Sequence, residues 1–330
     1  MRGFRNNHGN AAKLLLFFGI MILLFGVLSA GTEHILISSD RLVPVRNKNI
    51  YRIQREAEDS IDIIFLGDSL SYSSFSPMVL WRDHGTASFV CGQSGQKMNE
   101  AEDMLRVALR TQHPRVVVLE TNELFRNQAH GSRINDCIEA MLNYYIPLFR
   151  GHDIWKSLIM NKEYVEENYR GFAFRCTVKP YERGEYMEET DRTESMADTA
   201  ETHLDNIRAM CSEIGAELVL VSTPSPANWN YERHNTVSAY AEERSIPFID
   251  MNLLLEEVGI NWDTDSLDHG DHLNLSGAEK VTAFLGRYLA DMFALPDHRG
   301  EKAYHSWETE SAGYEEKAAT YLAEIRGENR

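Results

Sequence analysis

Residues 61–69, IDIIFLGDS, form a short apolar run that stops at a glycine and is followed directly by a serine. A run of this length, rich in β-branched residues and closed by Gly67, is typical of a buried strand in a parallel sheet. Ligands bind at the carboxyl ends of such strands, so Ser69 stands where a reactive serine is expected. Its own N–H and those of the next turn can hold an oxyanion, although many serines at this place only cap a helix.

Four further runs resemble this one, and helical patterns lie between them. The predicted strands are 61–66, 87–90, 115–120, 217–222 and 247–250, and the predicted helices are 99–110, 197–214, 237–244 and 276–292. In the last helix, Val281, Leu285 and Leu289 share one face with Phe284, Tyr288 and Phe293, and this face would cover the sheet. The alternation predicts an α/β fold, a doubly wound five-stranded parallel sheet over residues 59–295.

The N-terminal segment has the pattern of a membrane helix. Residues 1–13 contain Arg2, Arg5 and Lys13, and residues 14–32 are uncharged and mostly apolar. At about 1.5 Å rise per residue this run reaches across a ~30 Å hydrocarbon core. The basic flank predicts a cytoplasmic N-terminus, a single-pass anchor at 14–32 and a domain outside the cytoplasm. A cleaved signal peptide, giving a secreted protein, is the alternative.

The remaining segments complete the domain organisation. Residues 33–58 form a polar connector, and 140–195 an insertion into the domain that either builds the rim of a site or is a solvated loop. Residues 296–330 form an acidic, exposed and partly helical extension. The four cysteines have no zinc-type spacing, so we expect buried or disulfide-paired structural cysteines.

Composition and charge exclude several classes of protein. The 330 residues are 43% hydrophobic and 25% charged, which is ordinary for a folded globular protein and excludes a mostly disordered chain. The formal net charge of −17 repels phosphate backbones at long range. We therefore expect no nucleic-acid partner.

Three further motifs could complete a site around Ser69. Gly95, in GQSGQ after the second strand, can offer a backbone N–H, and Asn122, at the end of the third strand, can offer an amide. The stretch DHGDHLN, residues 268–274, precedes the last helix and contains His272, a candidate general base, preceded by two possible carboxylates, Asp268 and Asp271. A metal site that also uses His269 is the rival interpretation. It is less favoured, because it leaves the serine, glycine and asparagine without a role.

With these four blocks the chain resembles the SGNH/GDSL hydrolases, which are named for Ser, Gly, Asn and His on a flavodoxin-like sheet. Ser69, Gly95, Asn122 and His272 match in the family order. The resemblance implies Ser69 as nucleophile, His272 as base, and an oxyanion hole from the Ser69 and Gly95 N–H groups with the Asn122 amide. It implies no cofactor and no metal.

The sequence departs from the family pattern at two places. The third block usually reads Gly-x-Asn-Asp, whereas here Glu120 holds the glycine position and Glu123 follows Asn122. The last block usually has Asp three residues before the histidine, a position held here by His269. The acid is therefore Asp268 or Asp271, and Asp268 is slightly favoured.

One anchor followed by an exported domain resembles the cell-envelope members of this family. We expect a serine esterase or acyltransferase acting on an acylated polysaccharide, peptidoglycan, teichoic acid or lipid through an acyl-Ser69 intermediate. The alternatives are an inactive glycan-binding module, with Trp155, Trp229 and tyrosines as a platform, and a metal-dependent hydrolase using residues 268–272.

Overall fold

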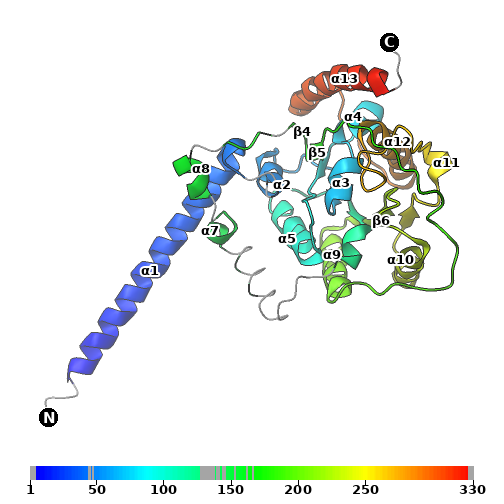
Figure 1. The fold of residues 1–330 in the computed structure, drawn as a ribbon. Coiled ribbons are helices and arrows are strands. Elements are labelled where there is room, and N and C mark those ends of the chain that lie inside the picture. The colour runs from blue at the N-terminus through cyan, green and yellow to red at the C-terminus, as the bar shows by residue number, and fades with distance from the viewer. Residues whose placement is uncertain are drawn as a thin grey trace. The chain divides into compact units, whose positions relative to one another are not determined.

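The computed structural model describes residues 5–43, 46, 48–126, 138, 142, 146–151, 154–160, 163–165 and 167–325. The chain divides into two compact units, which are described separately. The first comprises residues 1–45 and 131–165, and the second comprises 46–130 and 166–330. Figure 1 labels most of the helices and some of the strands of the two units.

The second unit is built around a five-stranded parallel sheet with the order β2-β1-β3-β6-β7. Its strands are β1 (Ile63–Leu66), β2 (Ser88–Val90), β3 (Val116–Glu120), β6 (Glu217–Ser222) and β7 (Phe248–Asp250). All five lie within the runs identified from the sequence, and the order is that of a flavodoxin-like doubly wound sheet. The predicted fold class is confirmed.

Helices cover both faces of this sheet. They are α3 (Ser69–Ser74), α4 (Pro77–His84), α5 (Met98–Ala108), α9 (Ala200–Ile214), α10 (Tyr231–Arg244) and α12 (Leu275–Met292). Helices α3 and α4 pack with α12, and α5 packs with α9 (Figure 1). The shorter elements are α2 (Lys48–Arg52), η3 (Ile53–Arg55), η4 (Thr121–Phe125), α11 (Leu255–Val258) and the hairpin β4 (Asn168–Tyr169) with β5 (Phe172–Ala173).

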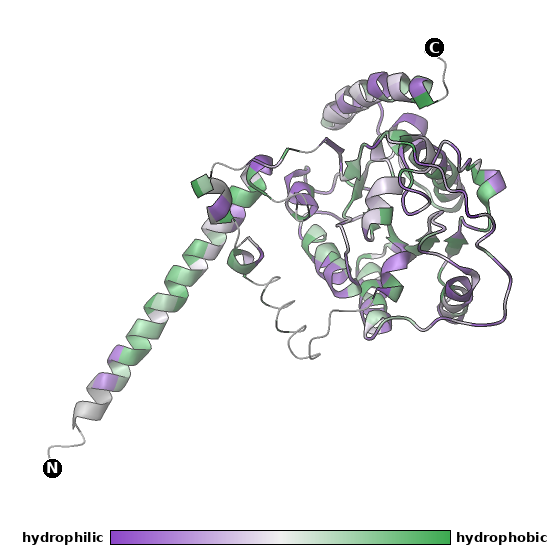
Figure 2. Cartoon of the chain, viewed as in Figure 1, coloured by the Kyte–Doolittle hydropathy of each residue, from purple (hydrophilic) through white to green (hydrophobic). Residues whose placement is uncertain are grey.

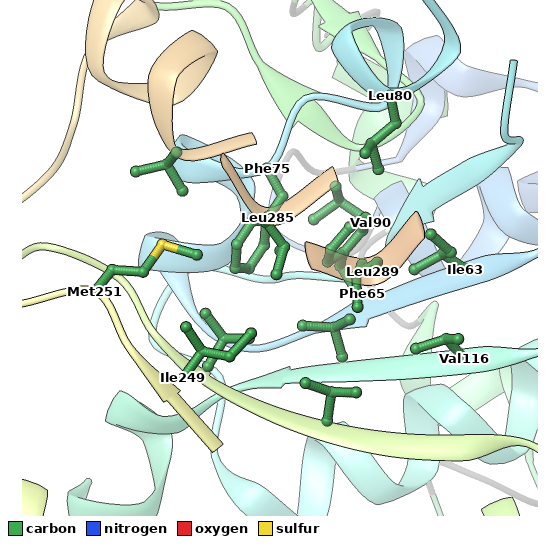
Figure 3. Close-up of a cluster of buried hydrophobic side chains, with 14 of the residues drawn as sticks. Ile63, Phe65, Phe75, Leu80, Val90, Val116, Ile249, Met251, Leu285 and Leu289 are labelled. Atoms are coloured by element: carbon green, nitrogen blue, oxygen red, sulfur yellow. The ribbon is translucent and has the colours of Figure 1, made fainter. Parts of the chain in front are cut away.

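The core between the sheet and α12 follows the predicted periodicity. Leu285 and Leu289 have no exposed surface and pack towards Ile63 and Phe65 of β1 (Figure 3). Alternate residues of each strand enter this core, because successive side chains in a strand point to opposite faces. Phe284, Tyr288 and Phe293 line its margin, half-buried. The predicted apolar face of the last helix is therefore confirmed.

The C-terminal segment differs from the sequence expectation in its burial. After η5 (Lys302–Tyr304), helix α13 (His305–Ile325) packs against α4, with the Trp307 and Trp81 ring centroids 5.3 Å apart. Tyr314 has no exposed surface, and its hydroxyl donates to Glu279 Oε1 of α12 at 2.7 Å. One face of this acidic helix is thus part of the fold. The Trp and Tyr residues of this segment, Trp307 and Tyr314 among them, were the sequence signal that could have predicted the burial.

In the first unit, α1 (Arg5–Ser38) is a single apolar helix, and Figure 2 shows hydrophobic residues along most of its length. Among the described residues it is the one helix long and apolar enough to cross a membrane, a property that signal sequences share. It continues beyond the predicted span into the predicted connector, followed by η1 (Asp40–Leu42). Near this end α7 (Pro147–Arg150) packs on it, with the Phe149 and Phe25 ring centroids 5.7 Å apart. A further helix is α8 (Ile154–Met160).

The described cysteines form no disulfide. Cys91, Cys176 and Cys211 are free thiols, and Cys137 lies outside the described residues. Burial raises the pKa of the Cys91 and Cys211 thiols well above the usual range, so both behave as small apolar core residues.

The packing of α13 predicts that the tail stabilises the second unit. Tyr314→Ala should lower the free energy of unfolding by about 3–5 kcal/mol, because it removes a buried ring and the hydroxyl that donates to Glu279 Oε1. The half-buried Tyr321→Ala should have a smaller effect. Urea midpoints of the detergent-solubilised protein, followed by tryptophan fluorescence, measure both. Equal midpoints for Tyr314→Ala and the parent would contradict the prediction.

Candidate functional site

Ser69 lies at the first position of α3, directly after β1, and is partly exposed. The preceding Gly67 has φ +140°, and a Cβ there would lie 2.7 Å from the Cβ of Glu120. Only glycine fits this turn, which brings the chain out of the strand and into the helix. The carboxylate of Asp68 caps the helix by accepting the Leu70 N–H at 2.9 Å. The GDS motif therefore fixes the position of the serine at the sheet edge.

His272 approaches Ser69 from the loop that precedes α12. Its Nε2 lies 2.7 Å from Ser69 Oγ, and its Nδ1 lies 2.8 Å from Asp268 Oδ2. Asp268 Oδ1 also accepts the His272 backbone N–H at 2.7 Å, so one carboxylate orients both the ring and its main chain. Asp268 is four positions before His272, one more than in the family pattern. Between them His269 (φ +64°) and Gly270 (φ +89°) have left-handed backbone conformations, which turn the longer loop so that the carboxylate reaches the ring. Serine, imidazole and carboxylate lie in hydrogen-bonded order.

Asp271, the other candidate acid, lies further from the ring. Its Oδ1 is 3.5 Å from His272 Nδ1 and accepts a hydrogen bond from Asn228 Nδ2 at 2.7 Å. Asp268, Asp271 and His272 also form a group whose ligating atoms lie within 4.8 Å of one another, the geometry that the metal interpretation requires. His269 is outside this group, and its Nδ1 lies 3.0 Å from the Pro180 carbonyl oxygen. His272 Nε2 faces the Ser69 hydroxyl and Nδ1 faces the Asp268 carboxylate, an arrangement that suits a general base, so we favour that role over a metal site.

The candidate oxyanion donors follow neighbouring strands. Asn122 Nδ2, after β3, donates one hydrogen to Asp68 Oδ2 at 2.8 Å, and no described residue accepts its second hydrogen. Gly95, after β2, has φ +63°. Within the described part of the chain, the N–H groups of Ser69 and Gly95 donate to no protein acceptor. These three groups therefore have hydrogens available, and they follow the adjacent strands β1, β2 and β3.

Two acidic residues that depart from the family pattern are buried beneath these donors. Glu120 accepts from the Asn122 N–H at 3.0 Å and the Thr223 N–H at 3.3 Å. Burial and the nearby Asp68 charge raise the pKa of Glu120 to about 8. The same causes hold the pKa of Glu123 well above its ordinary value, and both of its oxygens are buried without a hydrogen-bond donor. The Glu120 carboxyl is therefore mostly protonated near neutral pH, and both carboxyls keep their protons to a higher pH than an exposed glutamate would.

The structure adds residues that sequence reasoning missed. Arg233 Nη1 donates to Asn122 Oδ1 at 3.2 Å, and the Arg126 guanidinium donates to Asp68 Oδ2. Asn228 holds Asp271, as described above. A charged residue on an amphipathic helix has no sequence signal that distinguishes it from a surface residue, so Arg233 could not have been identified from its position in the chain.

The aromatic platform of the binding-module interpretation finds no support at Trp229. This side chain is buried, and its Nε1 donates to Asp250 Oδ2 at 2.9 Å in the core beside α10. It is therefore not a surface for stacking sugars. The side chain of Trp155 lies outside the described residues.

Comparison with solved structures shows distant similarity. The chain resembles a putative acylhydrolase from Bacteroides fragilis with 13% identity and TM-score 0.38, over 77% of this chain and 99% of that one. A GDSL-like lipase from Bacteroides thetaiotaomicron shows 14% identity and TM-score 0.35, over 70% and 88%. A putative platelet activating factor from Streptococcus pneumonia shows 13% and 0.40, over 82% and 99%. No family model and no curated protein matches the sequence, so we base the function on the geometry of the site.

Glu120 predicts a loss of stability at alkaline pH. Its pKa rises from an ordinary 4.5 to about 8 on folding. Its contribution to the free energy of unfolding is therefore fully present below pH 4.5 and is lost as the pH rises through 8. In Glu120→Gln the fall in unfolding free energy between pH 5 and pH 9 should be smaller by on the order of 3 kcal/mol. The exposed Glu217→Gln is the control. Denaturant unfolding at both pH values measures this difference. An equal fall in unfolding free energy in the parent and in Glu120→Gln would refute the prediction.

Proposed function

We propose that the chain is a serine esterase or acyltransferase of the SGNH type, working through an acyl-Ser69 intermediate. The hydrogen-bonded series Ser69 Oγ, His272 and Asp268 is the observation that carries this proposal. A serine hydroxyl is a weak nucleophile, and a neighbouring imidazole held by a carboxylate is the arrangement that activates it.

The geometry suggests the course of the reaction. Ser69 Oγ attacks the ester carbonyl carbon while His272 Nε2 takes the hydroxyl proton, and Asp268 stabilises the resulting imidazolium. The carbonyl oxygen becomes an oxyanion that the N–H groups of Ser69 and Gly95 and the free hydrogen of Asn122 Nδ2 would stabilise. His272 then returns the proton to the leaving alcohol. Water or an acceptor hydroxyl, deprotonated in turn by His272, then attacks the acyl carbon. The bond from this carbon to Ser69 Oγ breaks, and His272 returns the proton to Ser69.

The location and the substrate class are part of the same proposal. Helix α1, with its basic N-terminal flank, would anchor the chain in a membrane with residues 1–13 in the cytoplasm and the second unit outside. The substrates would then be O-acyl groups of an envelope polysaccharide, peptidoglycan, teichoic acid or lipid. The formal net charge of −17 disfavours a nucleic-acid substrate and does not by itself select among these partners.

Reactivity of Ser69 tests the proposal. The detergent-solubilised protein should be labelled by a fluorophosphonate at Ser69 and should hydrolyse p-nitrophenyl acetate. Ser69→Ala should lose labelling and on the order of 10³-fold or more in turnover, with little change in stability because the side chain is partly exposed. The matched control is Ser71→Ala, which should keep labelling and turnover. The Ser71 hydroxyl is buried and donates to the Asp68 carbonyl at 2.8 Å, so it is not available to a substrate. An alanine variant at 69 that keeps a tenth of the turnover would exclude Ser69 as nucleophile.

The two aspartates predict unequal effects on turnover. Asp268→Asn should lower kcat by on the order of 10²–10⁴-fold, because the carboxylate that orients His272 Nδ1 is lost. Asp271→Asn should lower it by less than about 5-fold, because Asp271 is held by Asn228 and lies 3.5 Å from the ring. Steady-state kinetics of both variants decide between them. Equal small losses would indicate a Ser69–His272 dyad, and a greater loss at Asp271 would reverse the assignment.

A further inference from the structure

The guanidinium of Arg233 lies between Asn122 and the end of the predicted insertion. Its Nη1 donates to Asn122 Oδ1 at 3.2 Å, and its Nε and Nη2 donate to the two oxygens of Glu194 at 2.9 and 2.8 Å. Nη1 also donates to the Asn228 carbonyl at 2.5 Å, and the guanidinium lies 4.7 Å from the centre of the Phe125 ring. Four groups therefore fix the position of this charge.

The two ends of the Asn122 amide have opposite requirements. Oδ1 faces the Arg233 cation, whereas Nδ2 faces the Asp68 carboxylate. A rotated amide would place its NH₂ group against Arg233 and its oxygen against Asp68, so both contacts would become repulsive. Only one orientation is satisfied, and in it the second Nδ2 hydrogen is free for an oxyanion. A cation on the carbonyl oxygen also polarises the amide and makes its N–H a stronger donor.

The segment that supplies Glu194 also contacts the loop of the proposed base. The Lys179 N–H donates to the Ser266 carbonyl at 2.9 Å, and the His269 N–H donates to the Lys179 carbonyl at 3.0 Å. At its other end, the Glu194 N–H donates to the Glu232 carbonyl of α10 at 3.3 Å. Residues 179–194 thus run from the His272 loop to the helix that carries Arg233.

We propose that Arg233 is a positioning residue that orients the Asn122 amide for oxyanion stabilisation, and that Glu194 holds Arg233 in place. This rests on the proposed function, because an oxyanion forms only if Ser69 attacks an ester. The insertion then contributes to the chemical step without contacting the substrate's reacting atoms. Loss of Arg233 should therefore lower kcat, because the hydrogen bond from the Asn122 amide to the substrate oxygen strengthens only as negative charge develops on that oxygen.

A double-mutant cycle tests this in the detergent-solubilised full chain with p-nitrophenyl acetate. Asn122→Ala should lower kcat by on the order of 10²–10³-fold. Arg233→Met should lower kcat by about 10- to 30-fold with KM changed less than about 3-fold. In the Asn122→Ala background the same change should lower kcat less than about 2-fold further, because the residue through which Arg233 acts is gone.

Matched controls exist on the same helix. Arg244 forms an ion pair with Glu201 at 2.7 Å, as Arg233 does with Glu194, but it has no contact with Asn122. Arg244→Met should leave kcat unchanged. Glu194→Ala should lower kcat about 3- to 10-fold in the parent and not in Asn122→Ala, whereas Glu201→Ala should have no effect in either. Should Arg233→Met fail to fold, the Glu194 cycle decides alone.

The outcomes separate the two proposals. If Ser69→Ala abolishes turnover but Arg233→Met or Glu194→Ala lowers kcat equally with and without Asn122, the esterase assignment stands and the positioning role is overturned. A change confined to KM overturns it as well. If Ser69→Ala keeps its turnover, the proposed function fails, and the role of Arg233 fails with it.

Discussion

The carboxylate of Asp68 has no exposed surface and accepts hydrogen bonds from the Leu70 N–H, the Asn122 amide and the Arg126 guanidinium. A buried carboxylate is tolerated only when its lone pairs are matched in this way. The same group therefore starts α3 at Ser69 and restrains Asn122 after β3. One buried carboxylate thus positions both the proposed nucleophile and the proposed oxyanion donor, so the aspartate of the GDS motif has a structural role.

The buried acids next to Asp68 bear on the charge of the site. A second or third negative charge here would oppose an oxyanion forming nearby. Burial and the nearby Asp68 charge raise the pKa of Glu120 and of Glu123, which favours the neutral form of each carboxyl over a further negative charge. The single charge of Asp68 is offset by Arg126. Glutamates at the positions that the SGNH pattern gives to glycine and aspartate are thus compatible with oxyanion chemistry while they hold their protons.

Much of the fold could be read from the sequence, because parallel strands buried on both faces give uninterrupted apolar runs, such as residues 63–66 and 116–119. The apolar face of α12 was equally clear. The short α4 was missed and α3 was expected only as a turn after Ser69, because a helix of one or two turns has too few residues for a period. In the site, Ser69, His272 and Asp268 each follow a recognisable motif, and the structure brings them within hydrogen-bond distance. Arg233 and Glu194 have no motif, since their roles depend on contacts between segments distant along the chain.

Ser69 and His272 are separated by 203 positions in the chain, and their hydrogen bond closes a loop that includes four of the five strands. The partners that hold this closure are equally remote, since the Ser76 N–H donates to Thr282 Oγ1, 206 residues away. Chains are synthesised from the N-terminus, so the serine emerges long before its imidazole. During that interval Ser69 is an ordinary alcohol without a base. If Ser69 acts as proposed, it therefore gains its base only after all five strands and the loop between β7 and α12 have been synthesised.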